Sequence, residues 1–319
     1  MLAPSNARLL DLVFPAPPRP VGHEMPGGSA HAAGDDRLTV RFWGTRGGIP
    51  RAGHDTARFG GNTLCVTVEL DRDRLFVFDA GTGMINLGQF IAAQKRHYRY
   101  HVFISNPYWS NVQGLPYFGP LQVPGNEIVA YGVGGELSLR QALAAQRSDP
   151  YQPVVGRERG SRITYRELKE GDYEIDQAHV SVIGLNHPGP ALGYRVTSAG
   201  GKTVAYVTGN EVFPHCASGA AATRERLVHF LKGVDILIHD ATYFDNEYHS
   251  HAGSGHSSVS PVLTLAAEAR VKRLYLIHHD PSHDDEAIGR MEMIARYFFE
   301  QRRLPIHCWA AREGSGVTI

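Results

Sequence analysis

From residue 38 onward, short runs of β-branched and aromatic residues alternate with longer segments whose apolar positions recur at helical spacing. The runs that predict strands are 38–43, 64–70, 75–78, 101–105, 127–131, 180–185, 192–196, 203–207, 235–239, 273–278 and 306–309. The segments that predict helices are 84–97, 136–146, 223–231, 259–269 and 285–300. Neighbouring strands early in the chain, followed by alternating helices and strands, predict layered sheets with helices on the outside.

Residues 1–37 differ from the rest, because Pro, Gly and Ala dominate the stretches PAPPRP and GGSAHAAGDD. Only residues 9–14 are apolar enough to pack against anything. We predict a flexible N-terminal arm over 1–37 and a single domain over 38–319, which contains no long linker and no short repeat. The arm is either a docking segment for a protein partner or a tail without a role, and the sequence leaves both open.

The composition says more about the protein's compartment and partners than about its activity. The 32 basic and 32 acidic residues cancel, which removes any global electrostatic case for binding nucleic acid or a membrane surface. No apolar run approaches the roughly 20 residues that span a bilayer, and the N-terminus lacks the pattern of a secretory signal. The three cysteines are isolated and odd in number, as is typical of reduced thiols. We expect a cytoplasmic protein without a membrane partner.

Polar residues gather directly after many of the predicted strands. These clusters lie at 79–83, 106–111, 186–189, 208–211, 239–240 and 278–280. One such cluster alone is usually a turn or a helix cap. If the strands share an orientation, however, all six clusters meet at one edge and form a single polar site.

The cluster at 106–111 lies within FISNPYWSNVQGLPYF, where a strand ends in a tight polar turn. Such a turn is where α/β enzymes place catalytic groups. Here the turn carries Asn106, Tyr108, Ser110 and Asn111, and none of these is a strong base or a strong metal ligand. The turn therefore has the position of a catalytic loop but lacks an obvious catalytic residue.

A series of motifs runs through most of the chain in a fixed order. It comprises FWGTRGGIPRAG (42–53), FGGNT (59–63), FDAGTG (78–83), WSNVQGLPYF (109–118), NHPG (186–189), LGYRV (192–196), LIHDATY (237–243), GHSS (255–258) and LIHHDPSHDD (276–285). The series resembles the metallo-β-lactamase fold, in the branch of ribonuclease Z and phosphodiesterase-like hydrolases. The resemblance implies an α/β fold built as a four-layer αββα sandwich, with two mixed β-sheets and helices on the outer faces, and it implies a homodimer.

In that family two divalent metal ions activate a bridging hydroxide, which attacks a phosphodiester or related bond. The resemblance places the family's His-x-His-x-Asp-His loop on Asn106, Tyr108, Ser110 and Asn111, its later His on His187, its bridging Asp on Gly209 and its final His on His278. Only His187 and His278 keep the residue type of the family. Both ligand carboxylates, which would hold two cations together, are replaced.

These replacements argue against a dinuclear metal centre, because neutral amides and hydroxyls bind zinc weakly and two imidazoles cannot hold two dications. We therefore expect no cofactor. The alternative is a single divalent ion, zinc or manganese, bound at His187 and His278. A new mononuclear site would draw on His249, His251, His256, His278, His279, Asp280 and His283, although their spacing fits no standard zinc pattern.

The predicted pocket nevertheless stays polar. Its candidate ligand-binding residues are Asn106, Tyr108, Asn111, His187, Asn210, Asp240, His256 and His278. Asp240 and His256 resemble a family pair near the scissile phosphate, and such a pair can hold an anion because an Asp favours a protonated imidazole. The competing interpretation is that these residues only bond strand ends. Asp79 resembles a family residue that braces the 106–111 loop, so we expect a structural role for it.

Three functions remain open. The leading hypothesis is a non-catalytic, metal-free protein with a binding or regulatory role, which senses a nucleotide or another phosphorylated ligand or scaffolds a partner. The second is a divergent metal-dependent hydrolase or phosphodiesterase rebuilt around His187, His256 and His278. The third is a structural subunit that acts through the arm and a dimer surface. Arg157, Arg159, Arg162 and Arg166 form either an anion-binding rim or a solvated charge run.

Overall fold

The computed structural model describes residues 37–70, 74–94, 98–146, 161–212 and 220–319. They belong to one compact unit, Asp36–Ile319. Residues 1–36 of the predicted arm, which include its apolar segment 9–14, lie outside the described residues, as do Arg157 and Arg159. Within the described part, two seven-stranded sheets form the centre of the unit.

The first sheet has the strand order β14-β1-β2-β3-β4-β5-β6. Its strands are β1 (Thr39–Gly44), β2 (Cys65–Glu69), β3 (Arg74–Phe78), β4 (Arg99–Phe103), β5 (Glu127–Gly132), β6 (Arg162–Glu167) and β14 (Gly316–Thr318). Pairing is antiparallel from β14 to β3 and parallel from β3 to β6. The carboxyl ends of β3 and β4 therefore lie side by side.

The second sheet has the order β13-β12-β11-β10-β9-β8-β7. Its strands are β7 (Gly171–Ile175), β8 (Ala178–Gly184), β9 (Leu192–Thr197), β10 (Thr203–Val207), β11 (Ile236–Asp240), β12 (Arg273–Ile277) and β13 (His307–Ala310). Pairing is antiparallel from β7 to β10 and parallel from β10 to β13. Every residue of β10 and β11 is buried, as expected for strands covered on both faces.

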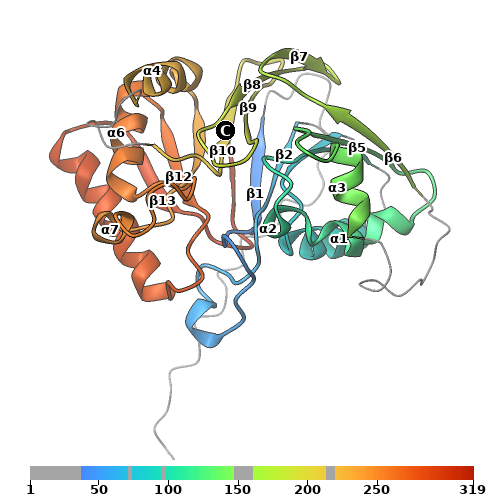
Figure 1. Ribbon diagram of the computed structural model, residues 1–319, viewed down its shortest axis with the longest axis horizontal. Coiled ribbons are helices and arrows are strands. Elements are labelled where there is room, and N and C mark those ends of the chain that lie inside the picture. The colour runs from blue at the N-terminus through green and yellow to red at the C-terminus, as the bar shows by residue number, and fades with distance from the viewer. Residues whose placement is uncertain (1–36, 71–73, 95–97, 147–160, 213–219) are drawn as a thin grey trace, which may run out of the picture. The chain divides into compact units, whose positions relative to one another are not determined.

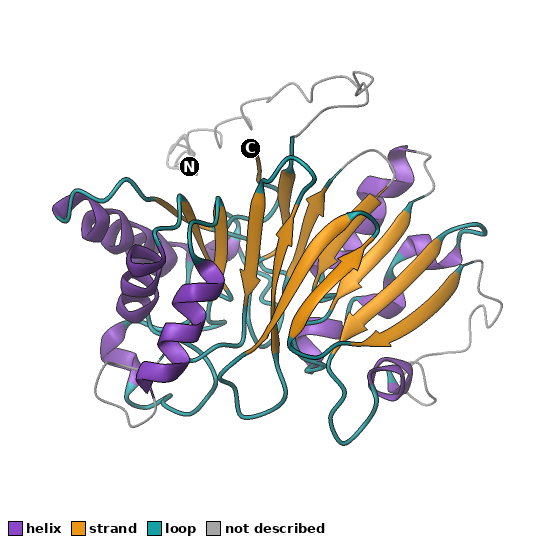
Figure 2. Ribbon diagram, turned by 90° about the horizontal axis from the view of Figure 1, so that it is seen from above, coloured by secondary structure: helices purple, strands orange, loops and turns teal. Residues whose placement is uncertain are grey.

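Helices cover the outer face of each sheet (Figures 1 and 2). The first sheet packs on α1 (Gly83–Gln94), α2 (Trp109–Val112) and α3 (Leu139–Ala145), with 3-10 turns at Leu115–Tyr117 and Gly119–Gln122. The second packs on α4 (Ala220–Leu231), α6 (Val259–Ala269) and α7 (Asp285–Gln301). A further apolar cluster, which includes Phe78, Phe103, Tyr194 and Tyr206, fills the space between the sheets. The predicted αββα sandwich is confirmed.

The remaining elements are the short helix α5 (Asp245–Tyr248) and a 3-10 turn at His54–Thr56. Strands β6, β7 and β14 were not predicted. The first two are polar edge strands, and β14 is a three-residue strand that exists through its pairing with β1. The helix predicted from residue 136 begins at Leu139, because Ser138 caps it in a capping box with Gln141. No helix in the described ranges is long and apolar enough to cross a membrane.

Candidate functional site

The polar strand ends of both sheets meet, as their shared orientation predicted. Leu192 N donates to the Ser105 carbonyl at 2.8 Å, which joins the start of β9 to the residues after β4. The Tyr206 hydroxyl on β10 donates to Asp79 Oδ2 after β3 at 2.7 Å. These bonds tie the two sheets together beneath the 105–111 loop.

Asp79 lies at the centre of this junction and is fully buried. Its Oδ1 accepts hydrogen bonds from Ser105 N and Ser105 Oγ at 2.8 and 3.0 Å, so the carboxyl group fixes the first residue of the loop. Its backbone has a φ of 57°, a conformation that Asp and Asn tolerate better than most residues. Burial raises the pKa of Asp79 to about 7, although hydrogen bonds from Ser105, Tyr206 and Thr208 favour the charged form.

This raised pKa predicts a specific pH dependence of stability. Between its ordinary pKa of 3.8 and about 7, the folded protein holds a proton on Asp79 that the unfolded chain has released. Stability therefore falls as the pH rises through this window, by about 2–3 kcal/mol between pH 5 and pH 8. In an Asp79→Asn variant this loss should be absent, because Asn keeps the tolerated φ and an acceptor oxygen without titrating. Urea unfolding of both proteins at the two pH values measures the difference.

Other groups also titrate over this range, so the comparison is between the slopes of the two proteins. The free energy of unfolding of the Asn variant, relative to wild type, is expected to rise from pH 5 to about pH 7 and to level off by pH 8. An Asn variant whose pH dependence equals that of wild type would show that Asp79 keeps an ordinary pKa in the folded protein.

The loop that follows β4 is held by its own amides. Asn106 Oδ1 accepts from Tyr108 N at 3.2 Å and from Asn111 Nδ2 at 2.9 Å. Asn111 Nδ2 also reaches Ser105 Oγ at 3.1 Å, and Ser110 Oγ donates to Asn111 Oδ1 at 3.0 Å. Asn106 and Asn111 are buried, so these mutual bonds satisfy groups that would be costly to leave unpaired. The loop keeps its shape through side chains that bind one another.

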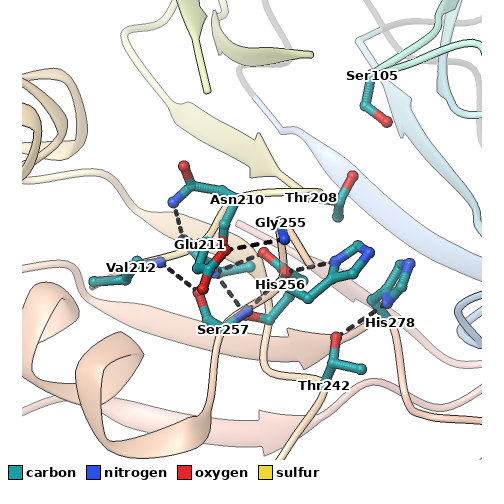
Figure 3. A network of polar contacts seen from close by, with 12 residues as sticks. Ser105, Thr208, Asn210, Glu211, Val212, Thr242, Gly255, His256, Ser257 and His278 are labelled. Atoms are coloured by element: carbon teal, nitrogen blue, oxygen red, sulfur yellow. Dashed lines mark hydrogen bonds and ion pairs between the residues drawn. The ribbon is translucent and has the colours of Figure 1, made fainter. Parts of the chain in front are cut away.

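The geometry distinguishes the two neighbouring positions after β10. A Cβ added to Gly209 would lie 2.9 Å from Asn106 Nδ2 and 3.4 Å from the His187 ring, so this position faces the loop and His187. Asn210 instead accepts from Asn186 N at 3.1 Å and contacts His239 Nε2 at 3.3 Å. Its side chain points away from the His256–His278 pair (Figure 3). Asn210 is thus a poor candidate for contacting a ligand, although the sequence suggested it.

Asp240, His256 and His278 do lie together. His256 Nδ1 is 3.1 Å from Asp240 Oδ2, and the His256 ring stacks on the His278 ring with centroids 4.1 Å apart. Burial favours the neutral acid, but hydrogen bonds from His239 and His256 hold the pKa of Asp240 below its usual value. With Nδ1 directed to Asp240, His256 has Nε2 left for another partner. This is the arrangement in which an Asp orients an imidazole for acid–base work or ligand binding.

The other two histidines of the site, His278 and His187, have neutral rings. Burial lowers the pKa of His278 to about 3, and its Nδ1 lies 3.0 Å from Thr242 Oγ1. Burial also lowers the pKa of His187, whose Nδ1 accepts from Gly189 N at 3.2 Å. Both rings are therefore hydrogen-bonding groups at neutral pH and not cations.

Glu211 and Ser257 are structural residues of the site that the sequence did not single out (Figure 3). Glu211 accepts from Tyr248 OH at 2.6 Å, from Gly253 N at 2.7 Å and from Gly255 N at 3.0 Å. It thus anchors the segment that presents His256. Ser257 Oγ donates to Asn210 O at 2.5 Å and accepts from Val212 N. Their only signal was their place in the polar cluster 208–211 and in the motif GHSS.

The donor set does not fit the dinuclear centre of the family. The positions of four loop ligands hold two amides, a phenol and a hydroxyl, and that of the bridging carboxylate holds Gly209. Among the described residues, no three His, Cys, Asp or Glu side chains come together as a metal site requires. Neutral oxygen donors without an anionic bridge do not offset the repulsion between two dications.

Four histidines of the predicted mononuclear site are engaged away from His256 and His278. His249 and His251 contact backbone carbonyls of their own segment, and His251 stacks on Tyr243. His279 Nε2 bonds the Ala311 carbonyl at 3.0 Å, and His283 Nε2 lies 3.1 Å from the Glu247 carboxylate. The structure does not gather them into one cluster. Of the basic run, Arg162 and Arg166 are exposed on the edge strand β6.

Comparisons with known proteins agree with the fold described above. Residues 74–279 match the family model described as the beta-lactamase superfamily domain. A ribonuclease Z from Ignicoccus hospitalis (strain KIN4/I) is 27% identical over 260 residues, which cover 68% of this chain and 80% of that protein. This similarity extends over both sheets.

Solved structures agree on the fold. The metallo-β-lactamase fold protein YhfI from Bacillus subtilis superposes with a TM-score of 0.64 at 16% identity, covering 89% of this chain and 100% of that one. The short form of human tRNase Z, ELAC1, gives a TM-score of 0.57 at 20% identity, covering 88% and 98%. At such identities the likeness concerns the fold alone.

Proposed function

Since the chain belongs to the metallo-β-lactamase superfamily, we propose that the site at its polar strand ends binds a nucleotide or another phosphorylated ligand without dinuclear hydrolysis. The role would be binding or regulation. The observation that carries the proposal is the donor set: where the family places anionic and imidazole ligands, this chain has Asn106, Tyr108, Ser110, Asn111 and Gly209.

The polar character of the pocket supports a ligand. The His256–Asp240 pair keeps a hydrogen-bonding imidazole at the meeting point of the strand ends. A pocket under no demand would fill with apolar side chains, which avoid the cost of burying polar atoms. Because His187 and His278 are neutral, recognition of a phosphate would rest on hydrogen bonds more than on net charge. We therefore expect ligand affinity to depend weakly on ionic strength.

The second candidate is a divergent metal-dependent hydrolase or phosphodiesterase that uses His187, His256 and His278. The comparisons favour it more directly than the binding role, because the similar curated proteins are ribonucleases Z. The three rings are neighbours, with centroids 5.7 Å apart for His187 and His256 and 4.1 Å for His256 and His278. One divalent ion, zinc or manganese, is the cofactor that this candidate requires.

Metal analysis of the purified protein, combined with a phosphodiesterase assay, distinguishes the binding role from the hydrolase. The binding role predicts well below one zinc, manganese or iron ion per chain after dialysis, and no turnover of bis(p-nitrophenyl) phosphate or of precursor tRNA with added Zn²⁺ or Mn²⁺. Near-stoichiometric metal with turnover that a chelator abolishes would instead establish the hydrolase. A His256→Ala variant is the control, since it removes a residue that both candidates use while leaving the loop amides intact.

The homodimer, and a protein partner bound through residues 1–37, remain predictions of the same kind. Sedimentation of the full chain and of a chain lacking residues 1–37 tests them together with the binding assay. If the protein is a scaffold that binds no ligand, it should capture a partner, and its melting temperature should not change with any nucleotide.

A further inference from the structure

A cleft of about 550 Å³ lies beside the segment 50–62. Its walls include Trp43 on β1, Asn86 on α1 and Glu313 in the turn after β13. None of the residues that line it belongs to the polar strand ends. Its volume is within the range of small-molecule sites, which is about 300–1,000 Å³. The cleft is therefore a second candidate binding site, separate from the one described above.

The carboxylate of Glu313 organises one wall of the cleft. Its Oε2 accepts from Gly61 N at 3.0 Å and from Asn62 N at 3.1 Å. Its Oε1 accepts from Asn62 Nδ2 at 2.5 Å and from Asn86 Nδ2 at 3.0 Å. Gly60 has a φ of 101°, and a Cβ there would come within 2.3 Å of Glu313, so the glycine lets the carboxylate approach the loop. Four donors thus hold this carboxylate in one position.

These hydrogen bonds also fix the orientation of two amides. Only the Nδ2 end of an asparagine can donate to a carboxylate, so the Oδ1 ends of Asn62 and Asn86 are turned away from Glu313. Neither Oδ1 accepts a hydrogen bond from any residue that the structure describes. Both side chains line the cleft. They therefore present two acceptor oxygens that are held in place and lack a protein partner.

The side-chain donors of the cleft, in contrast, are engaged by protein acceptors. Arg51 Nη1 donates to Pro281 O at 2.8 Å, and Arg51 Nη2 pairs with Asp55 Oδ2 at 2.5 Å. Trp43 Nε1 donates to a threonine hydroxyl on β2 at 2.9 Å, and the Thr56 hydroxyl bonds carbonyls of its own turn. The cleft is thus rich in acceptors and poor in donors.

We infer that this cleft binds a small organic ammonium compound, with its charged group at the Asn62 and Asn86 oxygens and its apolar part against Trp43. An ammonium group has donors only, so it complements a wall of acceptors. Because Asp55 neutralises Arg51, Glu313 leaves the lining with an excess negative charge that favours a cation. The partly exposed indole of Trp43 adds apolar surface and a further attraction for cations. The inference is independent of the function proposed for the strand ends.

Three probes of similar shape test the head group: phenethylamine, phenethyl alcohol and phenylacetate. In calorimetric titrations of the full chain at neutral pH, phenethylamine should bind about 5- to 30-fold more tightly than phenethyl alcohol, and phenylacetate most weakly. Added salt should weaken phenethylamine binding and leave phenethyl alcohol unaffected. Equal affinity for the three probes, or no binding of phenethylamine at millimolar concentration, would overturn the inference.

Two variants assign the binding to this cleft. Glu313→Gln removes the charge at nearly constant volume and should reduce the preference for phenethylamine over phenethyl alcohol to about 3-fold or less. Asn86→Ala removes one acceptor and should weaken phenethylamine binding about 5- to 20-fold. Asn246→Ala, which changes an exposed asparagine outside the cleft, should have no effect.

Thermal unfolding establishes that each variant is folded before its affinity is compared. Folded Glu313→Gln and Asn86→Ala proteins that keep the affinity and the preference of wild type would show that the amine binds elsewhere, which overturns the inference. If neither variant folds, the comparison of the three probes on the unaltered protein decides the outcome.

Discussion

Restoring the family's ligands is expected to raise zinc affinity at least about a thousand-fold, which corresponds to about 4 kcal/mol. The variant carries the changes Asn106→His, Tyr108→His, Ser110→Asp, Asn111→His and Gly209→Asp. Three imidazoles and two carboxylates then join His187 and His278, and the carboxylates supply the negative charge that two dications require. Equilibrium dialysis with Zn²⁺, followed by metal analysis, gives both the affinity and the number of ions per chain.

The change at Gly209 is the most demanding one. Its φ of 68° is strained for most side chains, but Asp79 has a φ of 57° in the same fold, so an Asp in this conformation is acceptable at about 1 kcal/mol. The nearest atom to its new Cβ is Asn106 Nδ2, which the variant itself replaces. The matched control keeps Gly209 and changes only the four loop positions. It should hold one ion at most, because it lacks the bridging carboxylate.

A correctly folded five-residue variant that binds zinc no better than wild type would contradict the prediction. It would mean that the loop after β4 no longer directs these positions toward His187 and His278. Circular dichroism and thermal unfolding establish whether the variant is folded before that conclusion is drawn.

Replacing Arg46 by Ala is expected to lower the free energy of unfolding by about 4 kcal/mol. The Arg46 side chain is fully buried. Its Nε donates to Gly60 O at 2.8 Å, and its Nη1 donates to Asp280 O at 3.1 Å and to His283 O at 2.5 Å. The Ala variant leaves these three carbonyls without their donor and opens a cavity beside the turn after β12. Thermal unfolding should show a fall in Tm of about 10 °C.

Arg51→Ala is the matched control, because Arg51 Nη1 bonds Pro281 O in the same turn at 2.8 Å. Its side chain is partly exposed and pairs with Asp55 near the surface, so its removal should cost only about 1 kcal/mol. If the two Ala variants unfold at the same temperature, the guanidinium of Arg46 does not hold the turn that leads from His278 to α7.

Most of the strands and the meeting of their polar ends could be predicted from the sequence, because both depend on local patterns. Residues 203–207 and 235–239 form apolar runs that end in polar clusters, and buried parallel strands read in this way. The motif series then gave the order of the elements. Polar edge strands such as β6 were not predicted, because RITYRE has no apolar run and only two apolar residues.

The side-chain geometry of the site depends on contacts that no local pattern encodes. The bond from Tyr206 to Asp79 joins residues 127 positions apart. The backbone at Gly209 is left-handed. The side chain of the next residue, Asn210, lies against Asn186 and His239. Glu211 accepts from three donors, all in the 248–255 segment. A glutamate after a turn has no sequence feature that predicts such an anchoring role.

The junction around Asp79 has a consequence for how this pocket can change over time. Its hydrogen bonds join both sheets and the Asn106–Asn111 loop using protein atoms alone. Because these bonds fix the loop from beneath, side chains on its outer side can be substituted one at a time while the junction stays intact. Each such step would leave a folded protein.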